Sequence, residues 1–115
     1  MAVIAATFTD VGPNAKMVTW TGLATNDTGQ PVELPEFGDR TVTVEGTFGG
    51  ATIVFNGSND GVGYYNCTDP QGTAFSKAVA AMEVIEEAPR FVRPEVTGGA
   101  GVALQCRMYA RRGAR

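Results

Sequence analysis

Hydrophobic and polar residues alternate along several stretches of the chain, with the two-residue period of a β-strand that buries one face. The clearest stretch is 102–109, where Val, Leu, Cys and Met occupy the even positions and Ala, Gln, Arg and Tyr the odd ones. In a second stretch, 41–48, the even positions carry Val, Val, Gly and Phe, and the odd positions carry Thr and Glu. Both stretches predict half-buried strands.

Turn-forming residues separate the other β-rich runs. Further strands are predicted at residues 3–8, 16–23, 51–55, 62–67 and 90–96. The glycine pair 49–50 predicts a hairpin between the runs that flank it, residues 57–61 (GSNDG) predict a second reversal, and residues 68–72 (TDPQG) a third. Pro94 cannot donate a hydrogen bond to a neighbouring strand, so 90–96 is predicted to be an edge strand or to contain a bulge.

One segment leaves its secondary structure open. Residues 77–88 (KAVAAMEVIEEA) are rich in good helix formers, and Val79, Met82 and Ile85 at a spacing of three would line one helical face. A short helix therefore fits this segment. An irregular strand with Val84 or Ile85 pointing inward fits it as well.

Many short strands separated by turns are typical of an antiparallel β-sandwich or jelly roll. We therefore expect an all-β, jelly-roll-like fold in which residues 1–115 form one domain. A length of 115 residues without a repeat or linker suits a single domain. Trp20 is expected in the core beside Val18, because residues two apart on a strand share a face.

The composition of the chain excludes some classes of binding partner. The net charge of −3 argues against a nucleic-acid surface, which usually carries a basic patch. The first ten residues, MAVIAATFTD, lack the basic region and the long apolar run of a signal peptide, and no stretch approaches the ~20 apolar residues of a membrane helix. Neither nucleic acid nor membrane is expected as a partner. A reducing cytoplasm is the expected site of synthesis, with Cys67 and Cys106 as free thiols.

The charges are uneven along the sequence, with an acidic first half and a basic C-terminal end. The acidic residues are Asp27, Glu33, Glu36, Asp39 and Glu45, and the basic ones are Arg107, Arg111, Arg112 and Arg115. This separation is compatible with head-to-tail contacts or with a partner of mixed charge. It is equally compatible with a solvated loop and a solvated tail.

Candidate chemistry is sparse. The chain has no histidine, which removes the commonest general base, the commonest metal ligand and every Ser–His or Cys–His pair. Two distant cysteines do not form a zinc site, and residues 59–61 (NDG) lack the spaced carboxylates and closing Glu of a calcium loop. The acidic pairs Glu86-Glu87 and Glu33/Glu36 are expected to be solvated. We predict no catalytic residue, metal or cofactor, and the chain is not expected to be an enzyme.

The adjacent tyrosines, Tyr64 and Tyr65, are candidates for a contact surface. Neighbours on a strand face opposite sides, so one of the two rings is expected to face outward. Outward tyrosines are common in protein interfaces, and an exposed aromatic row can also bind sugar rings.

Several turn and strand segments, in this order, carry a family resemblance. These segments are residues 46–52 (GTFGGAT), 57–61 (GSNDG), 68–72 (TDPQG) and 87–94 (EAPRFVRP). They resemble small structural proteins of tailed bacteriophages, the group that includes capsid decoration or cement proteins, over about residues 40–110. The GSNDG turn and the late strand also resemble discoidin-like jelly rolls that bind carbohydrate or lipid. Residues 62–65 (VGYY) depart from both groups, which commonly carry tryptophan there.

The resemblance implies a virion protein on the capsid surface, assembled in the bacterial host cytoplasm, that cements the expanded capsid by binding across subunits of the major capsid protein. It also implies a homo-oligomer, dimer or trimer, at local symmetry axes. The alternative is a carbohydrate-binding, discoidin-like module on the virion for host adhesion. The candidate interface residues are Val3, Ile4, Phe8, Tyr64, Tyr65, Arg111, Arg112 and Arg115. A simpler interpretation of the chain ends is also open: the N-terminal stretch would be an ordinary edge strand, and the C-terminal arginines would lie in a frayed tail.

Overall fold

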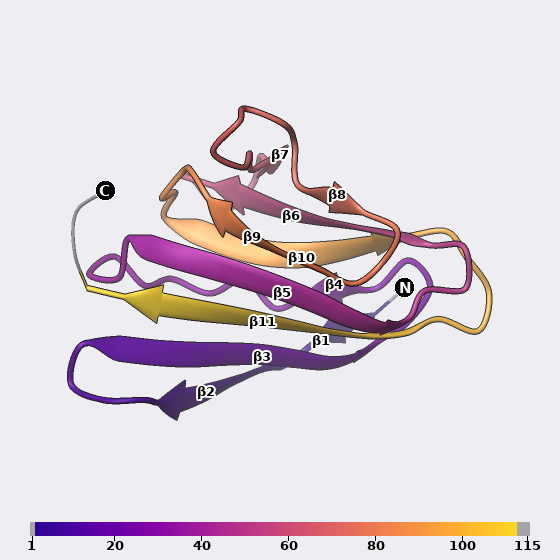
Figure 1. The fold of residues 1–115 in the computed structure, drawn as a ribbon, viewed down its shortest axis with the longest axis horizontal. Helices are drawn as coiled ribbons and strands as arrows, with labels where there is room; N and C mark the ends of the chain where they lie inside the picture. Colours follow the sequence, from indigo (N-terminus) through magenta and orange to yellow (C-terminus); the bar gives the residue numbers. More distant parts are fainter. Residues whose placement is uncertain (1, 113–115) are drawn as a thin grey trace.

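The computed structural model describes residues 2–112, and it confirms the expected all-β sandwich: two sheets stack face to face (Figure 1). The strands are β1 (Val3–Ile4), β2 (Ala6–Asp10), β3 (Ala15–Leu23), β4 (Thr28–Gly29), β5 (Asp39–Thr47), β6 (Thr52–Ser58), β7 (Tyr65–Asn66), β8 (Ser76–Lys77), β9 (Ala81–Ile85), β10 (Phe91–Thr97) and β11 (Ala103–Arg111). Sheet A has the order β1-β4-β10-β6-β7, with β8 also paired to β6. Sheet B has the order β2-β3-β11-β5-β9. Consecutive strands often lie in different sheets, so the chain crosses repeatedly between the two layers.

Sheet B is built on the strongest alternation in the sequence. Strand β11 pairs along its whole length with β5 on one side and with β3 on the other. The predicted inward residues of 102–109 are all buried, as are Val42 and Val44 of β5. The two-residue period therefore predicted both strands and most of their inward residues. It fails at the end of 41–48, where Gly46 is exposed and Phe48 is only partly buried.

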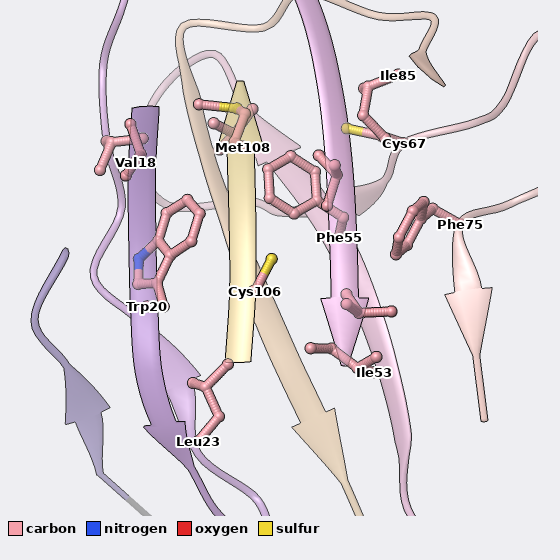
Figure 2. Close-up of a cluster of buried hydrophobic side chains, with 14 of the residues drawn as sticks. Val18, Trp20, Leu23, Ile53, Phe55, Cys67, Phe75, Ile85, Cys106 and Met108 are labelled. Carbon is pink, nitrogen blue, oxygen red and sulfur yellow. The ribbon is translucent and has the colours of Figure 1, made fainter. Parts of the chain in front are cut away.

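Aromatic rings join the two sheets in the core (Figure 2). Trp20 from sheet B is fully buried, as predicted, and meets Phe55 of sheet A edge to face at 6.1 Å between ring centroids. Phe55 meets Phe75 in the same way at 6.2 Å. The indole Nε1 of Trp20 donates a 3.0 Å hydrogen bond to the carbonyl of Gln30, so its polar atom is satisfied.

The hairpin predicted at Gly49-Gly50 is wrong. The glycines do reverse the chain, with φ of 58° and 86°, but β5 belongs to sheet B and β6 to sheet A. Because both flanking runs bury one apolar face, they satisfy the same pattern whether they pair with each other or pack across the core. The turn therefore connects the two layers.

The helix considered for residues 77–88 is also wrong; the described residues contain no helix, and hence none long and apolar enough to cross a membrane. Strand β9 lies there instead and pairs with β5, and Ile85 is buried opposite Arg40. Met82 is 65% exposed, so the spacing of three does not mark a buried face. Pairing with β5 outweighs the helix propensity of this short segment.

Pro94 is neither on an edge nor in a bulge. Strand β10 lies between β4 and β6, and its register with β6 is continuous. The amide and carbonyl of Val92 both bond to Val32, so by strand alternation the nitrogen of Pro94 faces that same side. There the chain runs past Gly29, which leaves space for the proline ring: a Cβ on Gly29 would lie 2.5 Å from Cδ of Pro94. The strand therefore does not need a backbone N–H donor at Pro94.

Two further predictions hold in part. The run 3–8 is not one strand, since the chain leaves sheet A after β1 and enters sheet B with β2. The reversal at 57–61 does join β6 to an antiparallel partner, with Gly57 opposite Tyr65, but that partner is only the two-residue β7. The segment before it is shaped by side-chain hydrogen bonds rather than by strand pairing.

Arg40 lies buried inside this sandwich, at 1% exposure. Its guanidinium donates to the carbonyls of Phe37 (2.8 Å), Leu34 (2.9 Å) and Pro89 (3.3 Å). Burial lowers the pKa of this group from its usual value. One side chain thus ties the segment before β5 to the segment before β10.

Candidate functional site

A groove of about 610 Å³ opens at the end of the sandwich where β6 finishes. Its walls come from the β6–β7 connection, from the segment after β7 and from the segment between β9 and β10. The lining residues are Gly57, Ser58, Asn59, Asp60, Gly63, Tyr65, Asn66, Cys67, Glu87, Ala88 and Pro89. They include one aromatic ring, two amides and two carboxylates. None of them carries a positive charge, so the groove suits a ligand that offers hydrogen-bond donors.

Asp60 shapes the first wall. Its Oδ1 accepts hydrogen bonds from the amides of Val62 (2.8 Å) and Gly63 (3.0 Å) and from the hydroxyl of Ser58 (2.9 Å). These bonds hold the pKa of Asp60 below its usual value, so the side chain is a carboxylate at neutral pH. Gly61 supplies the positive φ, 79°, that the turn requires. All three bonds use Oδ1.

Tyr65 stands at the rim of the groove with 79% of its surface exposed. Atoms of its ring lie 3.5–3.9 Å from where a Cβ of Gly63 would be, so the ring rests beside the bare backbone of that glycine. The ring is therefore supported on one side and open to solvent elsewhere. This is the arrangement of a stacking platform.

The second wall is held by Glu87 and Pro89. Both carboxylate oxygens of Glu87 accept hydrogen bonds from Thr68, one from its amide at 2.7 Å and the other from its hydroxyl. Pro89 packs over Gly57 so closely that a Cβ there would lie 2.3 Å from its Cγ. With Arg40 bonded to the carbonyl of Pro89, the wall is fixed in place.

Tyr64, unlike its neighbour, is already engaged. The guanidinium of Arg93 lies 3.7 Å from the centroid of its ring, in a cation–π contact. Arg93 also donates to Asn56 (3.2 Å), which in turn donates to Glu95 (3.1 Å). Of the two predicted tyrosines, Tyr65 is the one whose ring is available.

The candidate residues near the N-terminus lie on one flank of the sandwich. Val3 (69% exposed) is in β1, the edge strand of sheet A, and Phe8 (50% exposed) is in β2, the edge strand of sheet B. Ile4 packs partly against the core. The structure thus brings two of the three apolar side chains to the surface at adjoining free edges. We call residues 3–10 the N-terminal flank.

The candidate arginines are paired inside the chain. Arg111 forms an ion pair with Asp39, and Arg112 pairs with Glu36 at 2.9 Å while its guanidinium covers the ring of Phe37. Arg115 lies outside the described residues. Acidic and basic segments that are far apart in sequence therefore meet in the fold, and Arg107 with Glu45 at 2.6 Å repeats this pattern. At these positions the surface does not show the charge separation seen in the sequence.

The groove brings together residues that no pattern in the sequence groups. Asp60 was assigned to a plain turn and Glu87 to solvated charge, whereas both line the groove with Tyr65. One local signal was present: a Ser-x-Asp-Gly turn closely followed by an aromatic residue. The contribution of 87–89 rests on the β9–β10 connection, which no local pattern indicates.

Both cysteines are buried free thiols, as predicted. Burial, reinforced by the charge of Glu87, raises the pKa of Cys67 to about 12, and burial also raises the pKa of Cys106. Neither thiol is a ready nucleophile in the folded chain. Across residues 2–112, no three His, Cys, Asp or Glu side chains gather closely enough to hold a metal ion.

The arrangement defines a β-sandwich of the jelly-roll kind, and comparison with known proteins agrees. No protein-family model matches the chain, and no curated protein matches it. Among solved structures the chain is similar to the SPBc2 prophage-derived protein YomS, with a TM-score of 0.67 and 14% identity over 89% of this chain and 98% of that one.

Two further solved structures are more distant. An RmlC-like cupin protein from Desulfovibrio desulfuricans gives a TM-score of 0.50 and 12% identity over 93% of this chain and 81% of that one. The carbohydrate-binding module CBM6cm-2 of Cellvibrio mixtus lichenase 5A, solved with cellotriose, gives 0.34 and 14% over 96% and 86%, too remote to support an argument. YomS and the cupin establish the shared fold.

Proposed function

We propose that this chain is a structural protein of a tailed-phage virion, which decorates the expanded capsid and cements it by binding across subunits of the major capsid protein. The observation that carries the proposal is the similarity to YomS, a prophage-derived protein, over nearly the full length of both chains. A match of that extent covers nearly the whole sandwich in both proteins. The proposal assigns the chain no catalytic role.

The mechanism is a linkage effect. A protein that binds the expanded lattice, and has no site on the unexpanded one, stabilises the expanded state by the free energy of binding. Many identical copies on one shell add their contributions, and self-association at symmetry axes adds avidity. We therefore propose a dimer or trimer in the assembled state, located on the capsid surface after assembly in the host cytoplasm.

The N-terminal flank is the contact surface that we propose. The amide of Ala6 donates to Oε1 of Gln30 and so faces away from β3. By strand alternation the amide of Phe8 faces the same way, beside its half-exposed ring. An extended segment of a capsid subunit can add to such an edge, with main-chain bonds for affinity and the Phe8 ring for specificity.

Sedimentation tests the proposal. The purified chain is mixed with empty, expanded capsids of the phage that encodes it, assembled without the chain, and with unexpanded shells as a control. Co-sedimentation with expanded capsids alone, at a fixed copy number per shell, is the expected result. Sedimentation with isolated tails only, or with no particle, overturns the decoration role.

A variant pair tests the contact surface. Phe8→Glu places a charge on the free edge of β2 and is expected to weaken capsid binding at least about tenfold. Val79→Glu is the matched control, since Val79 is also an exposed apolar residue, at 69%, but lies outside the flank. Equal losses for both variants, or no loss for Phe8→Glu, would remove the flank from the interface. Light scattering of the bound and free protein measures the oligomeric state.

A further inference from the structure

The groove at the end of β6 is built differently from the N-terminal flank, and it fits another kind of partner. Its volume, about 610 Å³, lies within the range of small-molecule sites. It holds an open aromatic ring beside side-chain oxygens and amides, without a cation. We propose that this groove is a saccharide-binding site, which takes a neutral sugar of one or two rings.

The ring of Tyr65 carries the apolar part of the argument. Sugar rings present a face of C–H groups, and such a face stacks on an exposed aromatic ring. Tyr65 offers this surface because its ring rests beside Gly63, where a side chain would come within 3.5 Å of it. A platform held by the backbone loses little side-chain freedom when the ligand binds.

Polar groups on the walls of the groove can form hydrogen bonds with the hydroxyl groups of the sugar. The carboxylate of Asp60, which is held in place by three hydrogen bonds to Oδ1, lines the groove together with Asn66. A carboxylate and an amide satisfy hydroxyl groups in both directions, as acceptor and as donor. Glu87 and Pro89, fixed by Thr68 and Arg40, set the opposite wall before any ligand arrives.

The charge of the groove selects among ligands. Asp60 and Glu87 bring negative charge to the groove and none of its lining residues is basic, which disfavours an anion such as a uronic or sialic acid. A basic side chain of a protein partner is the competing occupant. A basic side chain would be attracted by the same carboxylates. It would not, however, make specific use of the amide of Asn66 or of the exposed face of Tyr65, both of which a sugar can contact.

Amide chemical shifts of the isotope-labelled full chain test the proposal. The probes are maltose, cellobiose, lactose and N-acetylglucosamine, with glucuronic acid as the anionic and arginine amide as the cationic comparison. At least one neutral sugar is expected to bind with a dissociation constant below about 10 mM and to shift residues 57–67 and 87–89. No shift with any neutral probe at that concentration, or shifts centred elsewhere, overturns the proposal. Tighter binding of arginine amide assigns the groove to a protein side chain and overturns it too.

Variants separate stacking from charge. Tyr65→Ala is expected to weaken sugar binding at least about tenfold, while Tyr65→Phe keeps the ring and most of the affinity. Asp60→Asn keeps an oxygen for the amides of Val62 and Gly63, so the loop persists, and its affinity should fall about threefold to tenfold. Tyr109→Ala is the control, because that partly exposed tyrosine lies on the outer face of sheet B. Full affinity in Tyr65→Ala removes the proposed site.

Discussion

The middle of sheet B and the groove end of sheet A are held together in different ways. In sheet B, three nine-residue strands pair along most of their length. At the groove end, β7 has two residues, and the chain around it is fixed by Asp60, Glu87 and Arg40, whose side chains bond to the backbone. Regular pairing stabilises the whole fold, whereas bonds from single side chains place single segments. A binding site needs the second kind of support, because its residues come from irregular connections.

Removing the largest core side chain should lower the stability of both regions together. Trp20→Ala deletes the indole that contacts Phe55 and is expected to lower the free energy of unfolding by about 3–5 kcal/mol. Urea denaturation followed by circular dichroism measures this loss. Trp20→Phe is the control and should lose less. A loss below about 1 kcal/mol would mean that the two sheets do not depend on this contact.

Removing the guanidinium of Arg40 should affect the groove end most. Arg40→Met leaves the carbonyls of Leu34, Phe37 and Pro89 without their donor, at an expected cost of about 2–3 kcal/mol in unfolding free energy. Hydrogen exchange should rise in 86–90 more than in β11. The control, Arg107→Met, removes a half-exposed ion pair and should cost less than about 1 kcal/mol. Uniform exchange in Arg40→Met would contradict a local role.

A single methyl group tests the packing of the groove wall. Gly57→Ala forces its Cβ to within 2.3 Å of Pro89, so the wall must move, with an expected loss of about 1–3 kcal/mol and altered amide shifts at 87–89. Gly50→Ala is the control. It meets no atom within 4 Å, and its φ of 86° costs about 1 kcal/mol without reaching the groove. Unchanged shifts at 87–89 in Gly57→Ala would show that Pro89 is not held there.

The smallest expected effect is a pH dependence of the turn around Asp60. Its pKa in the folded chain lies below the unfolded value of 3.8, so the carboxylate stabilises the turn fully above that value. The contribution is lost as the pH falls through the lower, folded pKa. The amide shifts of Val62 and Gly63 should follow this titration, and in Asp60→Asn they should not. A titration that survives in Asp60→Asn would assign it to another group.

The sequence allowed the regular half of the molecule to be predicted and left the irregular half open. Alternation placed β3, β5 and β11 and their buried faces, because a half-buried strand enforces a period of two. It did not show that Gly49-Gly50 joins different sheets, since pairing and stacking bury the same residues. At 77–88 the helix formers gave the wrong expectation, because β5 offers that segment a strand partner.

The site was predicted in part, for the same reason. An outward tyrosine near 64–65 was expected, and Tyr65 is the exposed one of the two. Which residues face it could not be inferred, because Asp60 and Glu87 meet through two connections whose course depends on the whole topology. Arg111 and Arg112 were candidates for contact with a partner, with a solvated tail as the alternative. Their acidic partners lie more than seventy residues earlier, and only the register of β5 with β11 brings them together.

Each of the two buried thiols can report on the opening of the part of the structure that covers it. Both cysteines belong to the buried core cluster (Figure 2): Cys106 lies within β11, and Cys67 is also among the residues that line the groove. A maleimide cannot react with either thiol until the surrounding chain opens. The rate of alkylation at each cysteine therefore measures how often that part of the structure opens. Loosening of the groove exposes one sulfur, and separation of the layers exposes the other. The protein can thus report its local and global openings separately without any added label site.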